Sequence, residues 1–106
     1  MPMQESFDCQ TIIRDDELLI SLCGDLDAYS VPLLQQAIDL KLVPTVRVVT
    51  LDCDAVKYVD SAFIQLLMRL NSQVKEVRIV NASRTIRKIF VITGLDSIFL
   101  PMEEPI

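Results

Sequence analysis

The sequence lacks histidine and has only two glycines, and each scarcity argues against a class of function. Without histidine, the chain cannot form within itself the serine–histidine or cysteine–histidine pair of nucleophilic enzymes. The scarcity of glycine argues against a phosphate-cradling loop, because such loops need several glycines for close backbone approach. Neither GxGxxG nor GxxxxGK[ST] occurs. These absences predict a protein that is not an enzyme.

The sequence has no paired cysteines. Cys9, Cys23 and Cys53 lie far apart and form no CxxC motif. Without such pairs, and without histidine, a zinc site is not expected. An odd number of cysteines in a chain with no export signal is typical of reduced thiols. Because each cysteine lies beside an apolar run, we expect all three to be small core residues.

The sequence also lacks an excess of basic residues, a long hydrophobic run and a signal peptide. Its formal net charge is −5, which argues against nucleic acid and against anionic lipid as partners. No stretch approaches the roughly 20 apolar residues that span a membrane. The N-terminus has neither the basic nor the apolar region of a secretory signal. We therefore expect a cytoplasmic protein that does not insert into a membrane.

The sequence has enough hydrophobic residues for a core. Its 106 residues are 51% hydrophobic, which fits one globular domain over residues 1–106. We expect the folded core at about residues 7–100 and a frayed tail at residues 101–106.

Strand and helix signals follow one another in the order β-β-α-β-α-β-α. Strands are expected at residues 7–14, 17–23, 46–51 and 77–80, with a last short one at 98–100. Helices are expected from Ser30–Pro32 to before Pro44, from Ser61 to about Asn71, and from a Ser83 cap to about Ile92. This order predicts an α/β fold, with a mixed sheet of four to five strands flanked by three to four helices.

The two glycines and a polar stretch mark the expected ends of elements. Gly24 ends the pairing of the second strand, and Gly94 suits the left-handed position after the last helix. The stretch Asp52–Lys57 is expected to be a loop that follows the third strand.

Aspartates cluster after the predicted strands. In a sheet of this order they would gather near one edge, where carboxylates could hold a divalent cation or act in acid–base chemistry. Hydrogen bonding at strand ends, turns and caps is the stronger explanation for such residues. The residues in question are Asp25, Asp27, Asp52, Asp54 and Asp60.

Ser61 is predicted to occupy the first position of a helix, directly after the cap Asp60. A helix N-terminus offers unpaired N–H groups and about half a positive charge, so a phosphate is tolerated there. Phosphorylation would add up to about two negative charges, which would repel a partner packed on that surface. Position alone does not make the case, since serine is common in first turns.

Three motifs in order resemble the successive signatures of the STAS domain, in particular those of bacterial anti-sigma factor antagonists. They are Gly24–Asp27, then Leu51–Asp52 with Val59–Ser61, then Ser83–Phe90 with Thr93–Leu95. The similarity covers roughly residues 10–99, and both glycines fall on family glycine positions.

The resemblance implies how such a protein works. In that family a partner that is both serine kinase and anti-sigma factor phosphorylates the serine after the aspartate, and a phosphatase restores the active form. It also implies one sheet flanked by helices and no cofactor. Carried over, Ser61 is the expected phosphorylated residue. The partner is expected to contact Asp25, Asp27, Asp60, Ser61, Ala62, Phe63 and Leu66.

The sequence departs from the family pattern after the serine. The serine is followed by Ala62 and Phe63, and Phe63 occupies the position two residues after the serine where the family has a glycine. A bulky ring therefore replaces open backbone at that position. The stretch Asn71–Glu76 is also short, which predicts a shorter second helix.

The same helix has two apolar faces. Ile64, Leu67 and Met68 are expected to face the core, whereas Phe63, Leu66 and Leu70 lie on an adjacent face. Either the whole helix is deeply buried, or the second face is an exposed patch for a partner or for a homodimer.

The departures keep a second function open. The alternative is a STAS scaffold subunit without a phosphorylation switch, such as the partner of an ABC transporter ATPase in lipid transport or a component of a signalling complex.

Overall fold

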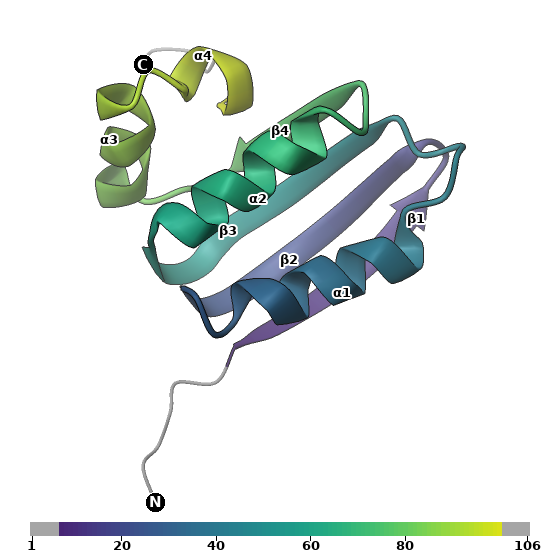
Figure 1. The fold of residues 1–106 in the computed structure, drawn as a ribbon, viewed down its shortest axis with the longest axis horizontal. Helices are drawn as coiled ribbons and strands as arrows, with labels where there is room; N and C mark the ends of the chain where they lie inside the picture. The colour runs from purple at the N-terminus through teal and green to yellow at the C-terminus, as the bar shows by residue number, and fades with distance from the viewer. Residues whose placement is uncertain (1–6, 101–106) are drawn as a thin grey trace, which may run out of the picture.

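The first two strands form an antiparallel hairpin, and two further strands add to it in parallel. The computed structural model describes residues 7–100, which contain a four-stranded mixed sheet and four helices (Figure 1). The elements are β1 (Asp8–Arg14), β2 (Glu17–Leu26), α1 (Val31–Lys41), β3 (Val48–Val59), α2 (Ser61–Asn71), β4 (Glu76–Val80), α3 (Arg84–Ile92) and α4 (Asp96–Phe99). The predicted α/β class is confirmed, whereas the predicted frayed tail at 101–106 lies outside the described residues.

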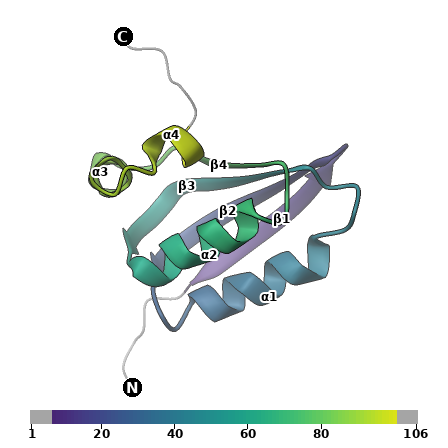
Figure 2. The ribbon, with the colours of Figure 1, turned by 45° about the horizontal axis from the view of Figure 1, so that its top comes forward.

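The sheet has the order β1-β2-β3-β4, and its central strands supply the core. Leu18 and Ile20 of β2 pair in register with Val49 and Leu51 of β3, which pair in turn with Val77 and Ile79 of β4. All six are almost fully buried. Because side chains alternate between the faces of a strand, this buried row lies on one face. Helices α1 and α2 lie side by side on that face of the sheet (Figures 1 and 2).

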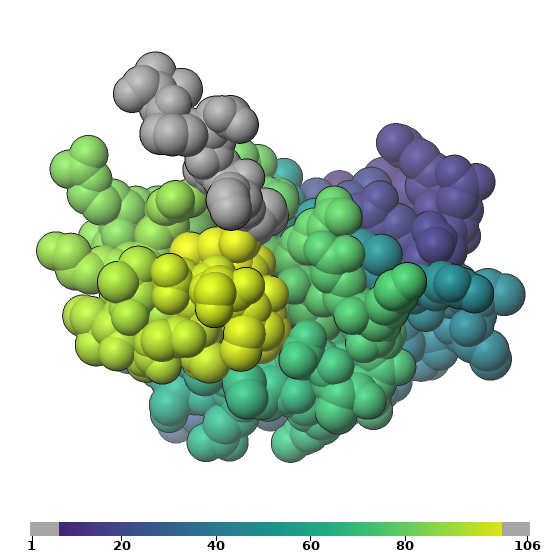
Figure 3. All heavy atoms as spheres, turned by 90° about the horizontal axis from the view of Figure 1, so that it is seen from above, coloured from purple at the N-terminus to yellow at the C-terminus, as the bar shows by residue number. Residues whose placement is uncertain are grey.

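Helices α3 and α4 lie at the β4 edge of the sheet (Figure 2). Seen from above, they and strand β1 occupy opposite ends of the molecule (Figure 3). Phe90 and Phe99 hold α3 and α4 together, with ring centroids 6.1 Å apart in an edge-to-face arrangement. Among the described residues, no helix combines the length and the apolar character needed to cross a membrane.

Two strands are longer than predicted. Gly24 was expected to end the pairing of β2, but it adopts a φ of 99° and pairs with Val56, and β2 continues to Leu26. The predicted loop Asp52–Lys57 is part of β3, which begins two residues later than expected and runs to Val59. Register shifts on both sides of Gly24 mark β-bulges, and a bulge interrupts the period-two pattern by which strands are recognised.

The predicted last strand at residues 98–100 is wrong, since Asp96–Phe99 forms the short helix α4. The chain turns toward it through Gly94, whose φ of 75° confirms the predicted left-handed position. The Gly94 N–H donates to the Val91 carbonyl at 3.1 Å, and the Leu95 N–H donates to the Phe90 carbonyl at 2.8 Å. This pair of bonds is the Schellman arrangement, which satisfies carbonyls left free at a helix end.

The expectation of three core cysteines holds for one of them. Cys53 is buried, and burial raises the pKa of its thiol to about 12. Cys9 is half-buried and Cys23 is exposed. Cys23 lies on the opposite side of β2 from the core row, because it is offset by one residue from Leu22.

Candidate functional site

The carboxyl ends of β2 and β3 bring three of the predicted site residues to one edge of the sheet. Leu26 pairs with Val59, and the Asp60 N–H donates to the Leu26 carbonyl at 3.1 Å. Asp25 therefore lies near the end of the strand adjacent to the one that leads into Asp60, and Asp27 follows directly after that strand. The first turns of α1 and α2 both follow from this edge.

A network around Asp27 holds the turn between β2 and α1. Asp27 Oδ1 accepts the N–H groups of Tyr29 and Ser30, each at 3.0 Å. The hydrogen bond from the Ser30 backbone, helped by that from Tyr29, lowers the pKa of the Asp27 carboxyl below its usual value. The Asp27 carboxylate thus has a structural task in this fold.

Ser30 does not cap α1 in the predicted way. Its buried hydroxyl donates to the Asp25 carbonyl at 2.6 Å and accepts the Asp27 N–H at 3.0 Å, so it makes no side-chain bond to the helix. The Ser30 carbonyl accepts the N–H groups of Leu33 and Leu34 in the first turn of α1. The Ser30 hydroxyl therefore binds the backbone at the end of β2 and not the first turn of α1.

Asp60 caps α2 as predicted. Its Oδ1 accepts the Ala62 N–H at 2.8 Å, and its carbonyl accepts the Phe63 N–H at 3.1 Å. Ser61 follows as the first helical residue and is exposed. The Ser61 side chain is accordingly open to solvent beside a carboxylate and a helix N-terminus.

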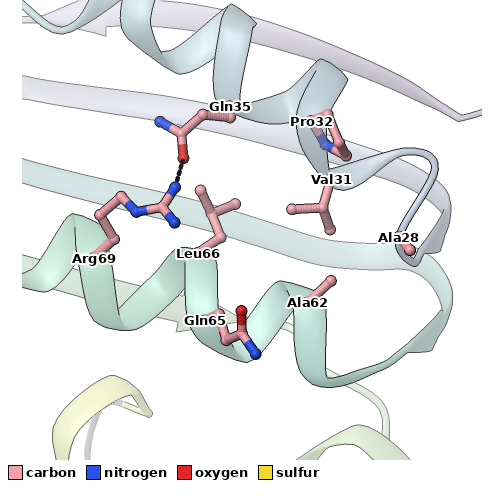
Figure 4. A pocket seen from close by; sticks show the side chains of 8 residues that line it. All are labelled: Ala28, Val31, Pro32, Gln35, Ala62, Gln65, Leu66 and Arg69. Carbon is pink, nitrogen blue, oxygen red and sulfur yellow. Dashed lines mark hydrogen bonds between the residues drawn. The ribbon is translucent and has the colours of Figure 1, made fainter.

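A groove runs between the N-terminal half of α1 and the face of α2 from Ala62 to Arg69 (Figure 4). Its volume is about 380 Å³. Arg69 and Gln35 face each other across it, with Arg69 Nη1 donating to Gln35 Oε1 at 3.2 Å. The lining residues are Ala28, Val31, Pro32, Gln35, Ala62, Gln65, Leu66 and Arg69.

The structure resolves the question of the second apolar face of α2. Phe63, Leu66 and Leu70 are buried in the core with Leu67, whereas Met68, which was expected to face the core, is 46% exposed. The ring of Phe63, a predicted partner contact, has no exposed surface in this structure. Leu66 is almost fully buried and only borders the groove.

Asp52 and Asp54 do not join the other aspartates. Asp52 lies in the middle of β3, beside the end of β4, where its Oδ1 accepts from Asn81 Nδ2 at 3.1 Å and from the Asp54 N–H at 3.0 Å. The extra length of β3 separates this pair from Asp60. Within residues 7–100, no group of three histidine, cysteine, aspartate or glutamate residues is arranged to hold a metal ion.

Sequence reasoning missed the polar residues of the groove and the exposed Tyr29. Gln65 and Arg69 lie one helical turn apart on α2, and Gln35 lies on the facing side of α1. Their signal was periodic: Ala62, Gln65 and Arg69 recur at the three- and four-residue spacing of one helix face. Tyr29, in the turn before α1, is 88% exposed.

Comparisons with known proteins give one consistent result. A family model described as "Mlab, STAS domain" matches residues 9–102. The anti-sigma-B factor antagonist of Staphylococcus aureus strain NCTC 8325 is 31% identical over 90 residues, which cover 81% of this chain and 83% of the relative.

Two solved structures share this fold over most of their length. An anti-sigma factor antagonist from Mycobacterium paratuberculosis matches with a TM-score of 0.81 at 22% identity, over 96% of this chain and 92% of the other. The Bacillus cell fate determinant SpoIIAA in its phosphorylated form matches with a TM-score of 0.68 at 20% identity, over 92% and 93%.

Proposed function

Because the chain belongs to the STAS domain family, we propose that it is an anti-sigma factor antagonist whose binding to a protein partner is switched off by phosphorylation of Ser61. The partner in this proposal is an anti-sigma factor that is also a serine kinase, and a phosphatase reverses the modification. The staphylococcal relative with this name supports the general role, and a structural neighbour known in a phosphorylated form supports the switch.

The observation that carries the proposal is the position of Ser61. Its side chain is exposed at the first residue of α2, and the next residue, Ala62, lines the groove between α1 and α2. A partner seated over the start of that groove would lie against the Ser61 hydroxyl. A change in charge at this single atom would therefore alter the surface that the partner contacts.

The local chemistry suits a switch that leaves the fold intact. Phosphoryl transfer forms a bond between Ser61 Oγ and the γ-phosphorus of ATP and releases ADP, and the hydroxyl proton passes to a base of the kinase. The N-terminus of α2 places a partial positive charge beside the new phosphate. Asp60, Asp25 and Asp27 already make this edge acidic, so the added charge would repel an acidic partner surface and would have to be desolvated on docking.

The test is phosphorylation and binding with the anti-sigma factor kinase of the same organism. We expect phosphate incorporation into wild type and into Ser97→Ala, but not into Ser61→Ala. Ser97 is the matched control because it is an exposed serine in the first turn of another helix, α4. We also expect Ser61→Asp to weaken partner binding by roughly tenfold or more, in line with about 1.4 kcal/mol of repulsion and desolvation. Equal labelling of Ser61→Ala and wild type would contradict the proposal.

A second candidate is a STAS scaffold subunit that binds its partner without a phosphorylation switch, such as the partner of an ABC transporter ATPase in lipid transport. It is favoured by the description of the matching family model, which names Mlab and not an anti-sigma factor antagonist. The buried Phe63 in place of the family's glycine points the same way. Recovery of a transporter ATPase by the chain, with undiminished recovery by Ser61→Asp, would select this candidate.

A further inference from the structure

Strand β1 is an edge of the sheet. Within residues 7–100 its only strand neighbour is β2, so the backbone groups on its outer side have no strand partner. An edge of this kind is a template for pairing with another chain, and native proteins protect it with proline, lysine, charges or a bulge. β1 reads DCQTIIR, without proline or lysine, and its seven pairs with β2 run without a register shift.

Apolar side chains are exposed along this strand. Ile12 is 57% exposed and Ile13 is 45% exposed, although they lie on opposite faces of the strand. Exposed isoleucines on both faces of an open edge favour a strand that is covered by another strand. A covering helix would protect one face only.

The charges of β1 decide which strand fits. Asp8 and Arg14 are exposed at the two ends, and they are the only charged residues of the strand. If two copies of β1 pair antiparallel about Thr11, Asp8 of each copy lies opposite Arg14 of the other. The same register places Cys9 opposite Ile13, Gln10 opposite Ile12, and Thr11 opposite itself.

We propose that β1 is a homodimer interface, in which two copies of the chain join their sheets edge to edge by antiparallel β1 pairing centred on Thr11. Pairing about this centre is two-fold symmetric, as a closed dimer requires. Along β1, residues with even numbers lie on one face and residues with odd numbers on the other. In this register each residue pairs with a residue of the same face. Ile12 then packs beside Gln10 on one face and Ile13 beside Cys9 on the other.

Charge complementarity favours a second copy over an unrelated strand. Two chains of net charge −5 repel each other over long range, so association needs local pairing of opposite charge. The dimer contains two Asp8–Arg14 pairs, and opposite charges placed directly across a strand pair stabilise it. The face of α2 considered for self-association cannot serve instead, because Phe63, Leu66 and Leu70 are buried.

The first experiment reverses the charges and measures mass by sedimentation of the full chain over a range of concentrations. We expect wild type to dimerise and Asp8→Arg to dimerise at least roughly tenfold more weakly, because Arg14 then faces arginine. Asp8→Arg/Arg14→Asp restores the opposed charges and should recover the dimer. The matched control Asp54→Arg makes the same change in net charge on an exposed residue of β3 and should not weaken the dimer.

The second experiment tests the register by crosslinking. In a Cys9→Ser/Cys23→Ser background, Thr11→Cys places two cysteines directly opposite each other, with Cα atoms about 4.5–5.5 Å apart, which is within the range that a disulfide bridges. We expect oxidation to give a covalent dimer with Thr11→Cys and none with Gln10→Cys, whose copies lie two positions out of register. A wild-type chain that sediments as a monomer at every concentration, or equal crosslinking of the two variants, overturns the proposal.

Discussion

Three aspartates at the same sheet edge have different tasks, and the difference arises from single hydrogen bonds. Asp60 binds the Ala62 N–H and caps α2, as the sequence predicted. Asp27 binds two N–H groups of the turn before α1, a role that needs the positions of Tyr29 and Ser30 and so could not be read from spacing. Asp25 contributes its backbone carbonyl, to the Ser30 hydroxyl. The sequence therefore predicted that aspartates gather at this sheet edge, but it did not predict which of their atoms form hydrogen bonds.

Asp27 gives the fold a pH dependence that can be measured. Its pKa is lowered in the folded chain by backbone hydrogen bonds, relative to about 3.9 in an unfolded chain. A lowered folded pKa means that the ionised carboxylate stabilises the fold above about pH 4, and that this stabilisation is lost as pH falls through the folded pKa. We expect Asp27→Asn, which keeps an acceptor oxygen, to be less stable than wild type at pH 7 and the difference to narrow in acid, as the pH falls below about 4. Urea unfolding at neutral and at acid pH checks this, and a stability gap that widens in acid would contradict it.

At the scale of elements, the sequence predicted the strands and helices well and their ends less well. The predicted bounds of α2 agree with the structure, because Asp60 is a strong N-cap and the apolar residues recur with a clear helical period. The end of β2 and the second half of β3 were missed because bulges beside Gly24 break the alternation of buried and exposed residues. The short apolar run at residues 98–100 favours a strand in the sequence, but a run of this length does not distinguish a strand from a helix. Phe99 belongs to α4 because its ring meets Phe90, which is a tertiary contact.

The burial of α2 predicts a sharp contrast between two of its apolar residues. Phe63 has no exposed surface, whereas Met68 is 46% exposed on the same helix. We expect Phe63→Ala to lower the free energy of unfolding by about 3–5 kcal/mol, because it removes a buried ring and leaves a cavity. Met68→Ala should cost under about 1 kcal/mol. Denaturant unfolding of both variants tests this, and similar losses for the two would show that Phe63 is not the core residue described.

At the scale of the whole molecule, the fold separates two candidate surfaces. Helices α1 and α2 cover one face of the sheet and hold the groove that ends near Ser61, while β1 forms an outer edge (Figure 1). Helix α1 lies between the groove and β1, because one side of α1 lines the groove and the helix also contacts β1. This arrangement allows a chain to pair through β1 and still present the groove to a partner.

The separation predicts that the two surfaces act independently. Ser61→Asp should leave the dimerisation constant within about twofold of wild type, because a charge at the start of α2 changes no atom of β1 and is screened beyond about 8–10 Å at physiological ionic strength. Conversely, Asp8→Arg should bind the anti-sigma factor kinase within about twofold of wild type, because a rim or remote charge changes affinity little once it is screened. Sedimentation of the chain alone measures the first effect, and titration of the kinase measures the second. Loss of the dimer in Ser61→Asp would mean that α1 couples the groove to the edge strand, and phosphorylation would then control assembly as well as partner binding.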